Sequence, residues 1–373
     1  MTLKINQISK LLSHLAIIFF LLRATFFNEI IFTLIGILFG LSAFILQARI
    51  FHINKNVFIF IILSLFISII TFYNNAFSRG LIFFPMIISG IGIAWSFYKN
   101  GLNHKFVLVI FYFLVFYYLI KILLFGYYPG EIFSNSRNHI SAMFINLFSL
   151  IVISSNINRL NINFIHCLTL LICCILAVGI SGILVSTFIF ITFLQYKYFF
   201  KIVTKYISLT VILNLLFVLI IVILWPFIQS FVQLNFEADT DIAIKYAKPL
   251  IDIFRESSRI LIINDYINLS DLKSFVFGNK LDLEINNLKN FHNSFIVLHV
   301  RAGIFFFGLI IFLIYAIIKN LRKDFMLGVC LLAITLRSFT DTTLFSGYHY
   351  EYIFIYLLLF SYKQNLETAD ERT

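Results

Sequence analysis

Residues 292–306 hold several groups that could do chemistry at the edge of an apolar run. At about 100° per residue, a helix here places His292, His299, Gly303 and Phe306 on one face. His292 lies at the polar start of this segment, where an imidazole with an ordinary pKa of about 6.5 can act as a general base. Gly303 would let another helix or a lipid chain approach closely. The structural alternative is a His–Asn helix cap followed by a packing glycine.

Arg301 lies within the same apolar run. It is roughly 13 Å along a helix from His292, at about 1.5 Å per residue, and on the opposite face. An arginine inside a membrane is costly and by default marks a functional site or a buried pair. The alternative is that its long side chain reaches the headgroup region.

Further upstream, charged residues recur at helical spacing in a hydrophilic stretch. Lys248, Asp252, Arg255 and Arg259 would share one face of a helix that begins near Pro249. Arginine suits the bidentate capture of phosphate oxygens. The alternative is a solvated helix face with charge pairs four residues apart.

Two more arginines lie at the borders of apolar runs. Arg137 precedes Asn138 in a Ser-Arg-Asn-His-Ile-Ser segment, and Arg337 lies four residues before Asp341, with which it could simply pair. With Arg259, Arg301 and His292, these arginines could line one cavity. Such a cavity would favour an anionic ligand, and a lipid diphosphate fits that description.

The elements that would position these groups are membrane helices. Hydrophobic residues make up 61% of the chain and charged residues 12%, with a mean hydropathy of +0.98. Soluble domains carry about 25% charged residues, so this chain needs lipid as its solvent. The net charge of +11 does not indicate nucleic acid, because the positions of the basic residues between the apolar runs explain it better. The cysteines all lie inside apolar runs, without metal-ligand spacing, and are expected to be buried: Cys167, Cys173, Cys174 and Cys330.

Apolar runs of membrane-spanning length recur along the chain and predict an all-α, polytopic transmembrane protein. The predicted spans are near 8–27, 30–47, 57–73, 80–98, 106–124, 139–155, 164–179, 181–196, 206–228, 293–318, 325–339 and 343–362. Spans seven and eight are separated by a tight Gly179/Ser181/Gly182 turn. The whole chain, 1–373, forms one transmembrane domain.

Lysine and arginine are distributed unequally between alternate loops. One set of loops holds fifteen: Lys4, Lys10, Arg49, Lys55, Lys99, Lys105, Arg159, Lys197, Lys201, Lys205, Lys319, Arg322, Lys323, Lys363 and Arg372. The short loops of the other set hold three: Arg23, Arg79 and Arg137. The positive-inside rule therefore predicts that both termini are cytoplasmic and that residues 229–292 form a long outer loop. Ile251, Phe254, Leu261 and Ile262 recur at helical spacing, so the loop is expected to be partly helical.

His292-Asn293, nine further residues and Gly303 resemble the signature of the O-antigen ligase and Wzy polymerase superfamily. In that signature the glycine is followed, two residues later, by Gly, Thr or Tyr, where this chain has Phe306. The segment 136–141, Arg259 with the Phe-Gly turn at 277–278, and the Arg337/Asp341 segment also look like conserved stretches of the family. Ser181-Gly182 resembles a Ser-Arg-Ser-Gly turn of the family but lacks its arginine.

The resemblance implies a GT-C-like glycosyltransferase of the bacterial cytoplasmic membrane, without a metal or other cofactor. Its donor and acceptor would be undecaprenyl-diphosphate-linked oligosaccharides, with a flippase and a chain-length regulator as associated proteins. His292 would be the general base and Arg259 a second catalytic residue. Substrate-binding residues would be Arg137, Asn138, Arg255, Asn293, Arg301, Arg337 and Asp341.

Three functions remain open from the sequence. The first is a polymerase that joins lipid-linked repeat units into O-antigen or capsule. The second is a ligase that moves finished glycan to lipid A core or protein. The third is a flippase or other transporter, against which stand the single long outer loop and the arginines confined to one side. A transporter would need polar residues near the midplane and access from both sides.

Overall fold

The computed structural model describes residues 2–27, 29–74, 77–127, 132–133, 137–177, 179–220, 266–268, 270–278, 293–340, 344 and 350–360. Every regular element in these ranges is a helix, so the all-α class expected from the sequence is confirmed.

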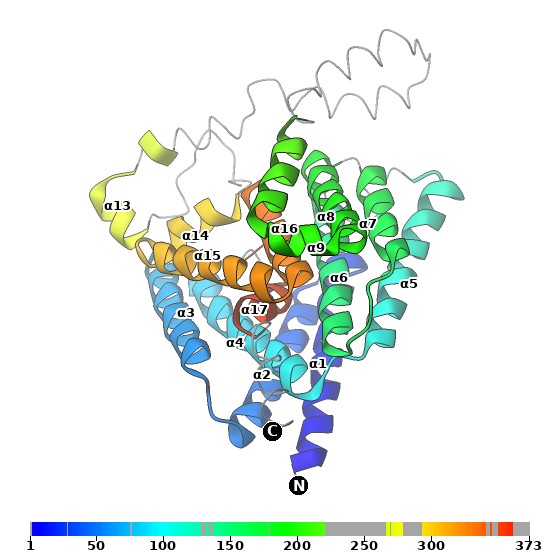
Figure 1. Ribbon diagram of the computed structural model, residues 1–373. Coiled ribbons are helices and arrows are strands. Elements are labelled where there is room, and N and C mark those ends of the chain that lie inside the picture. Colours follow the sequence, from blue (N-terminus) through cyan, green and yellow to red (C-terminus); the bar gives the residue numbers. More distant parts are fainter. Residues whose placement is uncertain are drawn as a thin grey trace, which may run out of the picture.

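The N-terminal part is a succession of long apolar helices (Figure 1). They are α1 (Thr2–Thr25), α2 (Ile30–Ile50), α3 (Lys55–Asn74), α4 (Phe77–Asn100), α5 (His104–Leu123) and α6 (Arg137–Ile157). Each has 20 to 24 residues. At about 1.5 Å per residue, that length matches a hydrocarbon core of about 30 Å.

The C-terminal part mixes long and short helices. They are α7 (Phe164–Leu176), α8 (Ile180–Tyr198), α9 (Phe200–Lys205), a helix over Ile207–Ile220, α13 (Leu272–Phe277), α14 (Ser294–Ala302), α15 (Phe305–Lys323), α16 (Phe325–Thr340) and α17 (Glu351–Leu359). The 13 residues of α7 and the 9 of α17 reach only about 20 Å and about 14 Å, less than the bilayer core.

Among the described residues, seven helices are long and apolar enough to cross a membrane: α1 to α6 and α15. This chain is therefore a multi-pass α-helical membrane protein. Each of the twelve segments expected to span contains described helix, but several are shorter than a bilayer is thick. The exact number of crossings stays a prediction.

Two predicted boundaries are wrong. The tenth span was expected as one helix over 293–318, but the chain breaks at Gly303 into α14 and α15. The turn before the eighth span was expected at Gly179/Ser181/Gly182, yet α8 already begins at Ile180, so Ser181 and Gly182 are helical.

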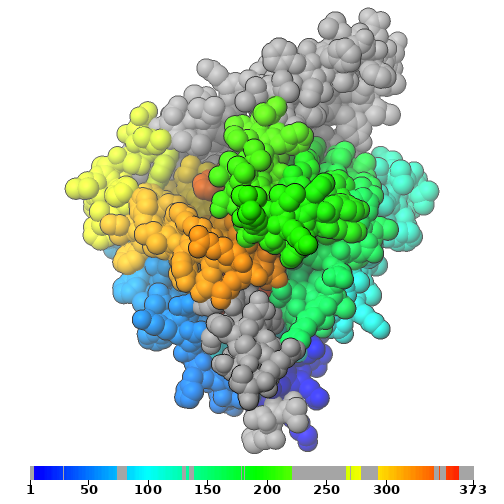
Figure 2. Space-filling view, in the orientation of Figure 1, coloured from blue at the N-terminus to red at the C-terminus, as the bar shows by residue number. Residues whose placement is uncertain are grey.

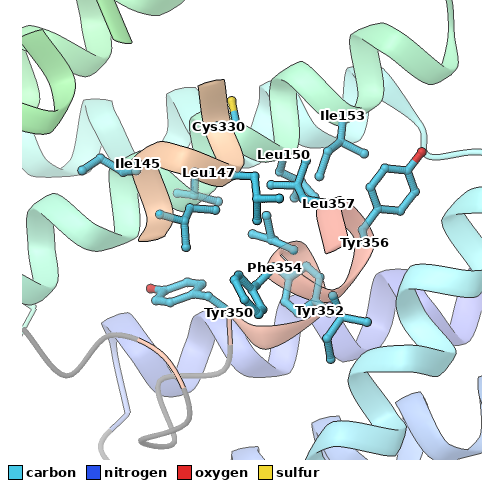
Figure 3. Close-up of a cluster of buried hydrophobic side chains, with 14 of the residues drawn as sticks. Ile145, Leu147, Leu150, Ile153, Cys330, Tyr350, Tyr352, Phe354, Tyr356 and Leu357 are labelled. Atoms are coloured by element: carbon cyan, nitrogen blue, oxygen red, sulfur yellow. The ribbon is translucent and has the colours of Figure 1, made fainter. Parts of the chain in front are cut away.

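The centre of the molecule is built by α6, α16 and α17. Residues 140–155 of α6 are all buried, as is every residue of α17. Figure 3 shows Leu147 and Leu150 of α6 pointing toward Phe354 and Leu357 of α17, with Cys330 of α16 beside them. A helix that is apolar on all sides is stable only when other helices surround it, and α6 packs against α5, α7, α8, α16 and α17. The prediction of buried cysteines is confirmed for all four.

Each of the outer helices has one face with exposed apolar side chains. Leu38, Ile69, Phe116 and Ile311, from α2, α3, α5 and α15, are between 56% and 69% exposed, as expected for side chains that face lipid. On its inward side, α2 presents glycines that allow close helix packing. A Cβ at Gly40 would lie 1.9 Å from the Ser89 hydroxyl oxygen of α4, so the two helices meet at backbone distance.

The described part of the long loop is partly helical, as expected. Asp271 caps α13, and its carboxylate accepts from the Ser274 amide at 2.7 Å. This hydrogen bond lowers the pKa of Asp271 below its ordinary value. The apolar stripe expected at 251–262 lies outside the described residues.

Candidate functional site

The side chain of Arg337 is buried inside the helix bundle and joins α16 to the first turn of α6. Only 1% of Arg337 is exposed. Its Nη2 donates to the backbone carbonyl of Asn138 at 2.6 Å and to the hydroxyl of Ser141 at 3.4 Å. The Ser141 hydroxyl in turn donates to the same Asn138 carbonyl at 3.0 Å. Two segments singled out in the sequence, 136–141 and 337, are thus in direct contact.

A third segment reaches the same place from α8. A Cβ added to Gly182 would lie 2.3 Å from the Ser141 Cβ and 2.4 Å from its hydroxyl oxygen, so only glycine lets α8 approach α6 this closely. From α7, the thiol of Cys174 lies 3.9 Å from the Ser141 carbonyl oxygen. Ser141 is therefore the point at which α6, α7, α8 and α16 meet.

The start of α14 lies beside the end of α16. Asn293 caps α14, accepting from the amides of Phe295 and Ile296 at 2.9 and 3.1 Å. The rings of Phe295 and Phe339 are 4.2 Å apart. The Ser294 hydroxyl accepts from the amide of residue 344 at 3.0 Å. Asn293 is consequently held next to the helix end that carries Arg337.

Gly303 is the C-cap residue of α14 and contacts the end of α13. Its φ of +52° is a left-handed conformation that favours glycine. A Cβ at Gly303 would lie 2.1 Å from the Val276 carbonyl oxygen, and that carbonyl accepts from the Ile304 amide at 3.0 Å. Because the helix breaks here, His299, Gly303 and Phe306 do not share one continuous helix face as expected, and His292 lies outside the described residues. Gly303 is instead the docking point of the Phe-Gly turn at 277–278.

Aromatic side chains surround His299 of α14. His299 is 8% exposed and lies within 6 Å of the ring centres of Phe275, Phe306 and Phe307. Its Nδ1 is hydrogen-bonded to the Tyr266 hydroxyl. Burial raises the pKa of Tyr266, so the phenol keeps its proton near neutral pH and can donate it. Sequence reasoning missed Tyr266, since one tyrosine in a long loop carries no periodic signal.

The other predicted site residues fall into two groups. Arg301 lies on α14 and is half-buried, and Arg137 is the first residue of α6. The remaining residues lie outside the described part of the chain: Arg255, Arg259, His292 and Asp341. The convergence expected for all the arginines is therefore observed only between the Arg337 side chain and the α6 start.

This site and the basic loops occupy opposite ends of the helices. Arg337 is about 18 Å along α16 from Phe325, at about 1.5 Å per residue. Lys323 lies two residues before that starting end, and Arg159 follows the far end of α6. The site therefore lies at the end that the positive-inside rule assigns to the outer side.

Chemically, this end offers cationic groups and helix N-termini. The first turns of α6 and α14 both start here, and helix N-termini favour anions. Among the described residues, no group of three or more His, Cys, Asp or Glu side chains gathers as a metal site would require. Comparison of the chain with family models, with curated proteins and with solved structures yields no significant match.

Proposed function

We propose that this protein is a polymerase that joins polyprenyl-diphosphate-linked oligosaccharide repeat units into O-antigen or capsular polysaccharide at the outer face of the bacterial cytoplasmic membrane. The observation that carries the proposal is the contact of Arg337 with Asn138 and Ser141. It supports the proposal because it joins two of the segments that resemble the polymerase family, although about 200 residues separate them.

In the proposed reaction, a sugar hydroxyl of the acceptor attacks the anomeric carbon of the donor glycan. The bond from that carbon to the diphosphate oxygen breaks, and the lipid diphosphate leaves with the bonding electrons. His292 takes the hydroxyl proton, as a general base at the polar start of α14. Arg259 and its neighbours stabilise the negative charge that develops on the leaving diphosphate.

The burial of Arg337 suggests a positioning role rather than direct contact with the diphosphate. Its guanidinium holds the carbonyl of Asn138 and thereby orients the first turn of α6. Arg337 would thereby also position Arg137, the first residue of that helix. The partly buried Arg301 would contribute from α14.

The proposal is tested by complementing a chromosomal deletion with wild-type protein or with His292→Ala. We expect His292→Ala to reach normal membrane abundance yet to produce only single-repeat glycans while lipid-linked repeat units accumulate. Loss of a general base typically slows a reaction by about 10²–10⁴. The matched control is His52→Ala, an exposed histidine between α2 and α3 at the opposite end. Its glycan ladder on a gel should be normal.

Three results would count against the polymerase. A full-length ladder from His292→Ala would remove the general-base role. Long polymer that stays on the lipid carrier after deletion of the protein would identify a ligase instead. An unchanged ladder after deletion would exclude both enzymes for this chain.

A further inference from the structure

Basic side chains gather at the end of the molecule opposite to Arg337. They belong to α8, α9 and α15: Lys197, Lys201, Lys205, Lys319, Arg322 and Lys323. In the described ranges 179–220 and 305–340, the one acidic residue is Asp324. Its carboxylate already accepts from the Leu327 amide at 3.1 Å and from the Asn156 side chain. The positive charge of this end is therefore not neutralised by these segments.

A pocket of about 440 Å³ opens within this basic region, between α9 and the end of α15. Figure 2 shows the two segments side by side, with the green atoms around residues 200–220 against the orange atoms of α15. The lining combines cationic and polar side chains with apolar ones. The polar set includes Thr204, Lys205, Ser208 and Arg322, and the apolar set includes Leu209 and Ile318. A cavity that offers both kinds of side chain matches an anionic amphiphile.

The short helix α9 has the character of a membrane-border element. Irregular backbone at Phe199 and Tyr206 separates it from the helices on either side. Phe199, Phe200 and Ile202 are between 52% and 59% exposed, while Val203 is buried against the protein. The Lys205 ammonium lies 5.1 Å from the centre of the Tyr206 ring. Aromatic residues interleaved with lysines are typical of the headgroup level of a bilayer.

We propose that this pocket binds the headgroup of an anionic phospholipid. Lys205 and Arg322 would pair with the phosphate, and the Ser208 hydroxyl would donate to a phosphate or glycerol oxygen. The acyl chains would lie along the exposed side chains of Leu209, Ile314 and Ile318. None of the described residues that line the pocket carries a carboxylate to hold a choline or ethanolamine group, so a net anionic lipid is preferred over a zwitterionic one. Basic pockets between membrane helices bind anionic headgroups in this way.

Native mass spectrometry of the full chain in detergent, titrated with phosphatidylglycerol or with phosphatidylcholine of the same acyl chains, tests this proposal. We expect at least tenfold tighter binding of phosphatidylglycerol. In the double variant Lys205→Gln/Arg322→Gln, its Kd should rise about thirtyfold, because each basic residue near the membrane surface contributes about 1 kcal/mol and 1.4 kcal/mol is tenfold. The control Arg49→Gln/Lys55→Gln removes the same charge at the α2–α3 turn and should change Kd less than twofold.

Three outcomes would overturn the proposal. The two lipids could bind equally, or both double variants could lose binding equally, which would indicate unspecific attraction. Competition by soluble glycerol 3-phosphate as strong as that by the lipid would indicate a phosphate site. Lys205→Arg is the control for a folding defect, since it keeps the charge and should retain phosphatidylglycerol binding.

Discussion

The guanidinium of Arg337 lies 2.6 Å from the backbone carbonyl oxygen of Asn138, a residue 199 positions earlier in the chain. This hydrogen bond connects the last turn of α16 with the first turn of α6. Both helices belong to the buried centre of the bundle, and the bond holds the site end of that centre together. The geometry of the proposed active site therefore depends on a side chain that is itself hidden from solvent.

Replacement of Arg337 should show whether this buried contact positions the site. Arg337→Lys keeps the charge but loses the planar group that reaches both the Asn138 carbonyl and the Ser141 hydroxyl. Hydrogen bonds to charged groups contribute about 1.5–3 kcal/mol, so we expect a loss of that order in unfolding free energy and a shortened glycan ladder. Thermal unfolding in detergent and membrane abundance measure the first effect. Unchanged stability and ladder in Arg337→Lys would show that the contact is dispensable.

Gly182→Ala should separate α8 from α6. Its Cβ would lie 2.3 Å from the Ser141 Cβ, and overpacking of this kind typically costs about 1–3 kcal/mol. Gly308→Ala is the matched control, because its Cβ would lie 3.9 Å from Leu63, an ordinary contact. The melting temperature should fall for Gly182→Ala and not for Gly308→Ala. Adding Ser141→Gly should restore part of the loss, and its failure to do so would argue against the clash.

Gly303→Ala should detach α13 from the break between α14 and α15. The variant combines a left-handed φ with a Cβ 2.1 Å from the Val276 carbonyl oxygen. Gly126→Ala supplies the control, since Gly126 has a φ of +63° and nothing within 4 Å of its Cβ. Backbone strain alone costs about 1–2 kcal/mol. We expect faster proteolysis between residues 266 and 278 in Gly303→Ala only. Equal effects in the two variants would leave strain as the whole explanation.

Asp324 predicts a pH dependence of stability. Burial raises the pKa of its carboxyl above the ordinary value, so the folded protein binds this proton more tightly than the unfolded chain. Unfolding free energy should therefore fall as pH rises from about 4 through the raised pKa. Asp324→Asn removes the titrating group and should flatten this slope. The measurement is the melting temperature of both proteins from pH 4 to 7, and parallel curves would contradict the prediction.

The orientation in the membrane is open to a direct test. Reporter fusions at Lys201 and Lys323 should report the cytoplasm, and a fusion at Asp271 should report the outer side, because the lysine-rich loops are retained inside. Two reporters, one active only in the cytoplasm and the other active only outside it, measure the location of each fusion. An Asp271 fusion found in the cytoplasm would move the proposed active site to the wrong side for a lipid-linked donor.

The helices themselves were largely predictable. The segment expected at 325–339 is α16, Phe325–Thr340, and the buried cysteines were foreseen from their apolar surroundings. Apolar length is a local property that the bilayer imposes on each segment, so it can be recognised one segment at a time. The break at Gly303 escaped prediction because apolar residues continue on both sides of it. At the break, Gly303 is in close contact with Val276 from another part of the chain, and no local pattern announces that contact.

Composition and the placement of lysine and arginine alone established a multi-pass helical membrane protein with unequally charged ends. These properties follow from the cost of exposing polar groups to lipid, and that cost applies to each segment separately. The tertiary structure decided that Arg337 is buried against Asn138, that Gly182 and Gly303 are points of close approach, and that a basic pocket forms beside α9. These depend on distances of a few ångströms between residues far apart in sequence. Such distances arise only when all the helices pack together.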